Sequence, residues 1–175
     1  VLLEDNHLLV VDKPAGLLTQ PSRSGDDSVL GRAKAYLKRR YNKPGNVYLG
    51  LVHRLDRNVS GVVVLARTSK AASRLSKQFA SRQVDKRYLA LVAGDAPDEA
   101  SLTHHLRPRL GERGMEVHVE GKRAELRYTT LAREGVFALL EVTLLTGRKH
   151  QIRLQLATHG LPIVGDPLYG SRARA

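Results

Sequence analysis

The alternation of apolar and polar positions along the chain predicts three helices separated by strands. Ser28 can cap a helix that reaches about Arg40, because apolar residues recur at every fourth position after it. Thr68 or Ser69 can cap a second helix, and residues 150–158 have the pattern of a third. The apolar stripes consist of Val29, Ala33 and Leu37 in the first helix and of Ala72, Leu75 and Phe79 in the second.

Short runs rich in Val and Leu, bounded by Gly, Pro, Asp or Asn, predict the strands. They cover residues 1–3, 8–11, 47–49, 62–65, 86–93, 101–106, 115–119, 123–131 and 136–145. The loops within the middle third are short, which favours antiparallel pairing of successive strands. A polar loop is expected over residues 19–27. Together these patterns predict an α+β fold, with a mixed, mostly antiparallel central sheet and packing helices.

Composition narrows the class of protein. A chain of 175 residues suits one domain, in one or two lobes. The net charge of +12, from 29 Lys and Arg against 17 Asp and Glu, implies a polyanionic partner, of which nucleic acid is the usual one. There is no membrane-length apolar run, no signal-peptide pattern and no cysteine. Charge alone does not separate RNA from DNA or from an anionic membrane as the partner. We expect a cytoplasmic location, no membrane association and a monomer.

The segment 51–61 carries the most informative cluster of polar residues. Asp56 lies among His53, Arg54 and Arg57, between two apolar runs that predict buried strands. Neighbouring positive charge keeps a carboxylate ionised, which suits a nucleophile or a base and not a proton donor. The charge pattern alone favours a plainer interpretation, a surface loop in which Asp56 neutralises its arginines.

Other candidates for chemistry are weaker. The histidines His104, His105, His118 and His159 lack the spacing and the acidic partners of a zinc site. The segment 13–16 lacks the Gly-Lys-Ser/Thr of a phosphate-binding loop, and we interpret it as a rigid turn that borders a cleft. Three cations on one face of the second helix are interpreted as a solvated surface in preference to a dedicated RNA contact, namely Lys70, Arg74 and Lys77.

Four blocks of sequence, in register over nearly the whole chain, resemble the motifs of the RluA family of RNA pseudouridine synthases. The first is Lys-Pro-Ala-Gly-Leu at 13–17, and the second is His-Arg-Leu-Asp at 53–56, followed by Ser-Gly at 60–61. The third is Lys-Arg-Tyr-Leu-Ala-Leu-Val at 86–92. The fourth is Thr-Gly-Arg-Lys-His-Gln-Ile-Arg at 146–153, with Gly-Asp-Pro-Leu-Tyr-Gly behind it at 165–170.

This resemblance implies the pseudouridine synthase fold and an isomerase of uridine in ribosomal or transfer RNA, without cofactor or metal. It implies that Asp56 is the catalytic carboxylate, that Arg153 is the cation that keeps it charged, and that Tyr88 stacks on the extruded uracil. The residues that it places at the substrate are Arg54, His53, Lys13, Arg148, His150 and Ile152, although a structural role is favoured for His53.

Two rival functions stay open at this point. One is a non-catalytic RNA-binding module with the same fold, and the other is a hydrolase that uses Asp56 with Asp166 as the nearest candidate acid. The sequence departs from the family at Val59, where threonine is common, and at Glu125 with Leu126. Residues 1–175 lack the further strand-rich segment and the small RNA-binding domain of many members, as in a trimmed or naturally short catalytic domain.

Overall fold

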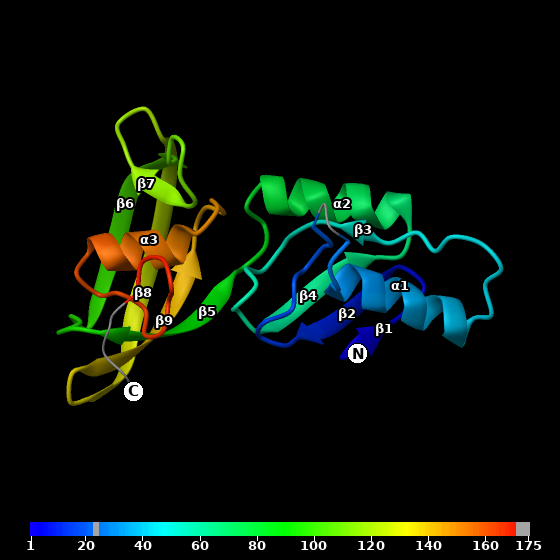
Figure 1. Cartoon of the computed structure of the whole chain (residues 1–175), viewed down its shortest axis with the longest axis horizontal. Helices are drawn as coiled ribbons and strands as arrows, with labels where there is room; N and C mark the ends of the chain where they lie inside the picture. The colour runs from blue at the N-terminus through cyan, green and yellow to red at the C-terminus, as the bar shows by residue number, and fades with distance from the viewer. Residues whose placement is uncertain (23–24, 171–175) are drawn as a thin grey trace. The chain divides into compact units, whose positions relative to one another are not determined.

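The computed structural model describes residues 1–22 and 25–170, which form two compact units that divide between Gln83 and Val84 (Figure 1). Two positions of the expected polar loop, and the five residues after Gly170, lie outside the described residues. The first unit contains β1 (Leu3–Glu4), β2 (Leu8–Lys13), α1 (Val29–Arg40), β3 (Gly50–Leu51), β4 (Gly61–Ala66) and α2 (Ser69–Ala80). The second contains β5 (Arg87–Ala93), β6 (Glu99–Pro108), β7 (Met115–Val117), β8 (Lys122–Glu134), β9 (Phe137–Leu144) and α3 (Gln151–Thr158).

The first unit is a four-stranded antiparallel sheet of order β1-β2-β4-β3 with one helix on each face (Figure 1). Leu65 packs in the same core as α1, and Ala66, the next residue of β4, points to the opposite face. On that second face α2 approaches so closely that a Cβ atom at Gly50 would meet the Cβ atom of Ala72 at 2.7 Å. Glycine at position 50 therefore allows α2 to lie directly on the sheet.

Both helices of this unit begin where the sequence predicts. The Ser28 side chain accepts a hydrogen bond from the backbone N–H of Gly31 (3.1 Å), and Thr68 accepts one from Ala71 (3.1 Å). The predicted stripe of α1 is buried against the sheet, as expected. In α2 the buried position is Ala71, whereas the three residues of its predicted stripe are half-buried, because one short helix covers only part of this face.

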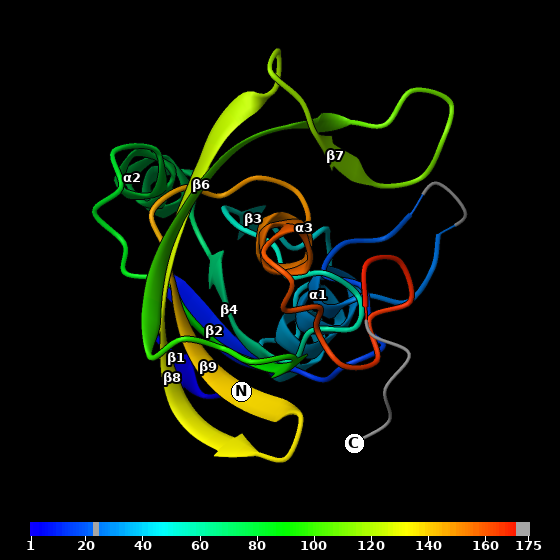
Figure 2. The ribbon, with the colours of Figure 1, turned by 90° about the vertical axis from the view of Figure 1, so that its left-hand side faces the viewer.

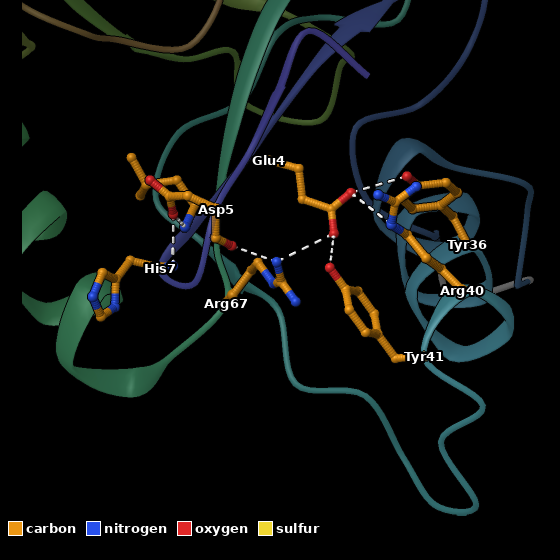
Figure 3. A network of polar contacts seen from close by, with 8 residues as sticks. Glu4, Asp5, His7, Tyr36, Arg40, Tyr41 and Arg67 are labelled. Atoms are coloured by element: carbon orange, nitrogen blue, oxygen red, sulfur yellow. Dashed lines mark hydrogen bonds and ion pairs between the residues drawn. The ribbon is translucent and has the colours of Figure 1, made fainter.

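A polar network at one end of the first unit joins β1 to the end of α1 and to the end of β4 (Figure 3). Glu4 accepts hydrogen bonds at Oε1 from Tyr41 (2.5 Å) and Arg67 (3.2 Å), and at Oε2 from Tyr36 (2.9 Å). Arg40 Nε lies 3.6 Å from the same Oε2. The bond from Tyr41, with the one from Tyr36 and the two arginines, lowers the pKa of Glu4 against the opposing effect of burial. Strand β1, only two residues long, is thus held by charge-assisted bonds.

The second unit is a five-stranded antiparallel sheet of order β5-β9-β8-β6-β7 that curves around α3 (Figure 2). A β-bulge between Thr130 and Ala132 interrupts the long pairing of β8 with β9. The core between sheet and helix is built from alternate residues of the strands and from the segment that follows α3. Its largest fully buried members are Val92, Leu126, Leu140, Val142 and Leu156.

The structure confirms the α+β class and refines the sheet. The predicted strands divide between two sheets, and every pair of strands in them is antiparallel. The predicted strand 47–49 is wrong, because pairing with β4 begins only at Gly50. Val47 and Leu49 are buried while Tyr48 is half exposed, so their alternation reflects packing without ladder hydrogen bonds. No helix in the described part of the chain is long and apolar enough to cross a membrane.

Candidate active site

The loop that carries Asp56 connects β3 to β4 and is bonded on one side to the loop after β2. The buried hydroxyl of Thr19 donates to the carbonyl of Leu55 (2.7 Å) and accepts from the N–H of the same residue (3.2 Å). Gly16 N–H donates to the Arg57 carbonyl (2.8 Å), and Arg57 Nε donates to the Gly16 carbonyl (2.9 Å). These reciprocal pairs hold the residues on both sides of Asp56.

A buried lysine completes this brace. The side chain of Lys13, at the end of β2, is 0% exposed, and its Nζ donates to the carbonyls of Leu17 (2.7 Å), Pro14 (3.0 Å) and Arg57 (3.0 Å). Burial lowers the pKa of Lys13 from its ordinary value, and the negative charge of Asp56 opposes that shift. The ammonium therefore ties both loops together within electrostatic range of Asp56.

His53 anchors the other side of the Asp56 loop. Its Nε2 accepts a hydrogen bond from the N–H of Val64 (2.9 Å), and its ring stacks on Phe79 of α2 with 5.0 Å between centroids. Burial lowers the pKa of His53, which agrees with a neutral ring protonated on Nδ1. This anchor leaves the next residue, Arg54, exposed at the surface, and Asp56 is half-buried.

In the second unit, a buried glutamine organises the turn that precedes α3. Gln151 accepts hydrogen bonds at Oε1 from the Thr146 hydroxyl (2.8 Å) and the Arg148 N–H (2.9 Å), and its Nε2 donates to the Glu125 carbonyl (3.0 Å). His150, the residue just before Gln151, adopts a left-handed backbone with φ 53°, which is unusual for a residue other than glycine. The turn is thus fixed by contacts from β8, from Thr146 just after β9, and from α3.

Arg153 forms a buried ion pair on α3. Its Nε and Nη2 donate to the two carboxylate oxygens of Asp166 at 2.5 and 2.9 Å, and Asp166 is only 4% exposed. Asp166 also accepts from the N–H groups of Leu168 (2.8 Å) and Tyr169 (3.0 Å). Burial alone would raise the pKa of Asp166, but the bond from Arg153 and the backbone donors outweigh it and lower the pKa to about 2.

The other predicted site residues of this unit lie on α3, on β5 or on the turn before the helix. Tyr88, on β5, and Ile152, on α3, are half-buried and pack against the core of the sheet. Arg148 is exposed, and its Nε donates to the carbonyl of Arg123 (3.0 Å). The ring of His150 lies against Tyr169, with Nδ1 3.1 Å from the hydroxyl oxygen.

The structure therefore groups the predicted residues by unit. Four of them, Lys13, His53, Arg54 and Asp56, belong to one braced pair of loops, and the other five, Tyr88, Arg148, His150, Ile152 and Arg153, belong to the second unit. No group of three His, Cys, Asp or Glu side chains suited to a metal ion occurs within residues 1–22 and 25–170.

Sequence reasoning missed the supporting roles of three buried polar residues, Thr19, Gln151 and Asp166. Each lies within or next to a motif of the predicted site, so its position was an available signal. The sequence did not reveal the role of each residue, because a polar side chain in a motif can equally well contact substrate or bond its neighbours. In chemical terms, the arrangement presents one carboxylate on a rigid loop and one arginine whose orientation is fixed by a buried partner.

Comparison with known proteins places these features in a family. Residues 7–158 match the family model described as RNA pseudouridylate synthase. The ribosomal large subunit pseudouridine synthase D of Xanthomonas campestris is 42% identical over 97% of this chain and 51% of its own length. The corresponding protein of Pseudomonas aeruginosa is 37% identical over 99% of this chain and 54% of its own. The chain thus spans about half the length of these curated relatives.

A solved structure agrees with this assignment. The human RNA pseudouridylate synthase domain containing 4 superposes with a TM-score of 0.83, at 27% identity, over 99% of this chain and 70% of that chain. The human RNA pseudouridylate synthase domain containing 1, with a TM-score of 0.76 and 24% identity, shares the fold.

The brace around Asp56 predicts that Lys13→Met destabilises the protein. Loss of the ammonium removes the Lys13 bonds to the Pro14 and Leu17 carbonyls and one of the two donors to the Arg57 carbonyl, and we expect the free energy of unfolding to fall by about 3 kcal/mol. Urea unfolding followed by circular dichroism measures this change. The matched control is Lys34→Met, at an exposed position of α1, which should change stability by about 0.5 kcal/mol at most. Equal effects of the two substitutions would contradict a structural role for the Lys13 ammonium.

The Arg153–Asp166 pair predicts a defined acid sensitivity. Since folding lowers the pKa of Asp166 from 3.8 to about 2, its contribution is present above pH 4 and is lost as the pH falls towards 2. The shift in pKa corresponds to about 2 kcal/mol of the free energy of unfolding. Asp166→Asn should remove this pH-dependent contribution to stability. Asp98→Asn, at a side chain 91% exposed and paired with Arg133, is the control and should leave the profile between pH 4 and 2 nearly unchanged. A profile for Asp166→Asn that still falls like that of the wild type over this range would contradict the assignment.

Proposed function

This chain belongs to the RNA pseudouridylate synthase family, and we propose on that basis that residues 1–175 form a catalytic domain that isomerises uridine to pseudouridine in ribosomal RNA. The observation that carries the proposal is the Asp56 loop. It is braced by buried Lys13 and Thr19 on one side and by half-buried His53 on the other, while Arg54 beside it stays exposed. The names of the relatives favour ribosomal RNA over transfer RNA as substrate.

The reaction is a rearrangement in which no atoms are gained or lost overall. The bond from ribose C1′ to uracil N1 breaks, the base rotates, and a bond from C1′ to C5 forms. C5 gives up its proton and N1 acquires one. The reaction thus needs a group that acts on the sugar, contacts that hold the detached base, and exclusion of water.

Asp56 is proposed as the group that acts on the sugar. An ionised carboxylate beside the ribose can attack C1′, stabilise a cationic sugar as in glycoside chemistry, or take a proton from the ribose. All three routes require a charged and immobile carboxylate. The bonds from Thr19, Lys13 and Gly16 to the residues adjoining Asp56 meet the second requirement.

Arg153 and Tyr88 are proposed to complete the site from the second unit. In this proposal the guanidinium of Arg153 faces the Asp56 carboxylate and keeps it ionised when water is excluded. The bonds to Asp166 use Nε and Nη2, and they would fix the plane of the guanidinium for that contact. The ring of Tyr88 is proposed to stack on the uracil, which must leave the RNA helix before it can react.

The exposed Arg54 is proposed to contact the RNA next to the reacting nucleotide. An arginine at this position can occupy the gap that the extruded base leaves, or bind a neighbouring phosphate. The same role in RNA binding is proposed for Arg148, which is exposed on the turn before α3.

The two rival functions are less well supported. A glycoside hydrolase needs a protonated carboxyl as general acid, and Asp166, the candidate for it, is buried against Arg153 with its pKa lowered to about 2. A non-catalytic RNA-binding module would have no need of a carboxylate on a loop that a buried lysine braces. The proposed isomerase makes use of both features.

The first test of this function is Asp56→Asn. The amide keeps the shape of the side chain but loses the charge, so isomerisation should fall by at least about 1,000-fold while RNA binding stays close to that of the wild type. Release of tritium from RNA labelled at uracil C5 measures turnover, and a filter-binding assay measures affinity.

The matched control for this test is Asp12→Asn, at an exposed aspartate of β2 in the same unit. It removes the same charge one residue before Lys13, and turnover should stay within about 3-fold of the wild type. Substantial turnover by Asp56→Asn would exclude Asp56 as the catalytic residue, and lack of turnover by the wild type on ribosomal RNA would overturn the function itself.

A second test addresses the coupling of Arg153 to Asp56. If Arg153 keeps Asp56 charged, Arg153→Ala should lower kcat by about 100-fold or more, and the double variant with Asp56→Asn should be little worse than Asp56→Asn alone. The control is Asp166→Asn, which breaks the same buried ion pair from its other side. Asp166→Asn keeps the Arg153 charge and loses only its orientation, so its kcat should fall less than that of Arg153→Ala. A wild-type kcat in Arg153→Ala, at a matched folded fraction, would exclude this role for Arg153.

A further inference from the structure

The positive charge of the chain is concentrated in its first unit. Residues 1–83 contain 15 Lys and Arg against 6 Asp and Glu, whereas the rest of the chain contains 14 against 11. Helix α2 contains three cations and no acidic residue. All three are exposed, and within the described residues no ion pair involves Lys70, Arg74 or Lys77, whereas Arg32, Arg40 and Arg67 of this unit each lie beside a carboxylate.

The geometry of α2 turns these cations into a line that leads towards the Asp56 loop. Residues at positions i, i+4 and i+7 lie within about 60° of arc and span about 10 Å along a helix. The helix begins at Thr68, just after the far end of β4, and Phe79 in its last turn stacks on His53 at the base of the Asp56 loop. The cations therefore extend from the far end of the sheet to the loop, along the surface of one unit.

The end of α2 supplies an independent observation. Arg82 has a left-handed backbone with φ 60°, its N–H donates to the carbonyl of Phe79 (3.3 Å), and the N–H of Gln83 donates to that of Gln78 (2.9 Å). This is the helix ending that favours glycine, because a side chain is strained there. Helix α1 ends in the same way with Asn42, a residue that tolerates the conformation better. An exposed arginine at this position lowers the local stability relative to glycine, and it adds a positive charge at the end of α2 that is nearer to the Asp56 loop.

We propose that the α2 track, defined as Lys70, Arg74, Lys77 and Arg82, binds the phosphodiester backbone of the RNA segment that adjoins the target uridine. The inference rests on the proposed function and names a second contact surface for its substrate. A cationic stripe without carboxylates attracts a polyanion along its whole length, and its end at the loop delivers the strand to Asp56. Helix α1 also begins next to the Asp56 loop, where the Val29 N–H donates to the Leu18 carbonyl, but its cation at that end, Arg32, is paired with Asp27. The last turn of α1, with three of its other cations, approaches Glu4 at the other end of the sheet.

The test compares two triple variants that each lose three positive charges. In the first, Lys70, Arg74 and Lys77 are replaced by glutamine, and in the control, Lys34, Lys38 and Arg39 of α1 are replaced by glutamine. The α2 variant should bind a ribosomal RNA fragment at least about 10-fold more weakly at 0.15 M salt. The slope of its log affinity against log salt should fall by about 2 to 3, because each lost phosphate contact removes about 0.7 to 0.9. The control should lose less than about 3-fold, and the loss in the α2 variant should appear in KM more than in kcat.

Two further variants separate charge from structure. The combination Lys70→Arg, Arg74→Lys and Lys77→Arg keeps every charge and should restore wild-type affinity. Arg82→Gly removes a cation and relieves the left-handed backbone, so its melting temperature should stay equal or rise while its RNA affinity falls. A lower melting temperature for Arg82→Gly, or unchanged affinity, would remove Arg82 from the track.

The remaining outcomes distinguish this inference from the proposed function. Equal losses of affinity in the α2 and α1 triple variants would overturn the track in favour of a diffuse attraction by net charge. Wild-type affinity in the α2 variant, with tritium release still dependent on Asp56, would overturn the track and leave the isomerase standing. Tight binding of the wild type to anionic vesicles, lost in the α2 variant while RNA affinity is kept, would assign the surface to lipid instead.

Discussion

The donation of three hydrogen bonds by the buried ammonium of Lys13 is the interaction on which the candidate site depends. A buried charge is costly unless it is fully bonded, and here the three donors meet three backbone carbonyls from two separate loops. Neither loop could relax without leaving the ammonium or the carbonyls unpaired. The bracing of Asp56 is thus enforced by a desolvation penalty, which acts over a short range and is insensitive to salt.

The second unit uses the same principle with different groups. Gln151 is bonded at both ends of its amide, and the carboxylate of Asp166 accepts from Arg153 and from two backbone N–H groups. In both units, buried polar side chains bond the backbone of motif loops while the segments themselves carry little regular structure. Burial and hydrogen bonding therefore do for these loops what ladder hydrogen bonds do for the strands.

The surface of the first unit is governed by longer-range forces. Its excess of Lys and Arg cannot be neutralised by six acidic side chains, and the acid-free helix α2 presents three of these cations on one face. Rigid short-range bonding around Asp56 and a cationic surface beside it serve different stages of the proposed reaction, since attraction to RNA is electrostatic and base rearrangement requires a fixed geometry. Arg82, with its left-handed backbone at the end of α2, is the member of the proposed α2 track that follows the contact of Phe79 with His53.

The sequence by itself determined the class of fold, the helix cap at Ser28, the start of the second helix at Thr68 or Ser69, and the position of Asp56 in a loop that precedes a strand. These features depend on local periodicity and on residues within a few positions of each other. Only the tertiary structure showed that Lys13 is buried and bonded to Arg57, 44 positions away, that Asp166 is bound to Arg153, and that the strands divide into two sheets. Such contacts join distant segments, and a charged residue in a motif loop has the same sequence pattern whether it faces a ligand or the protein interior.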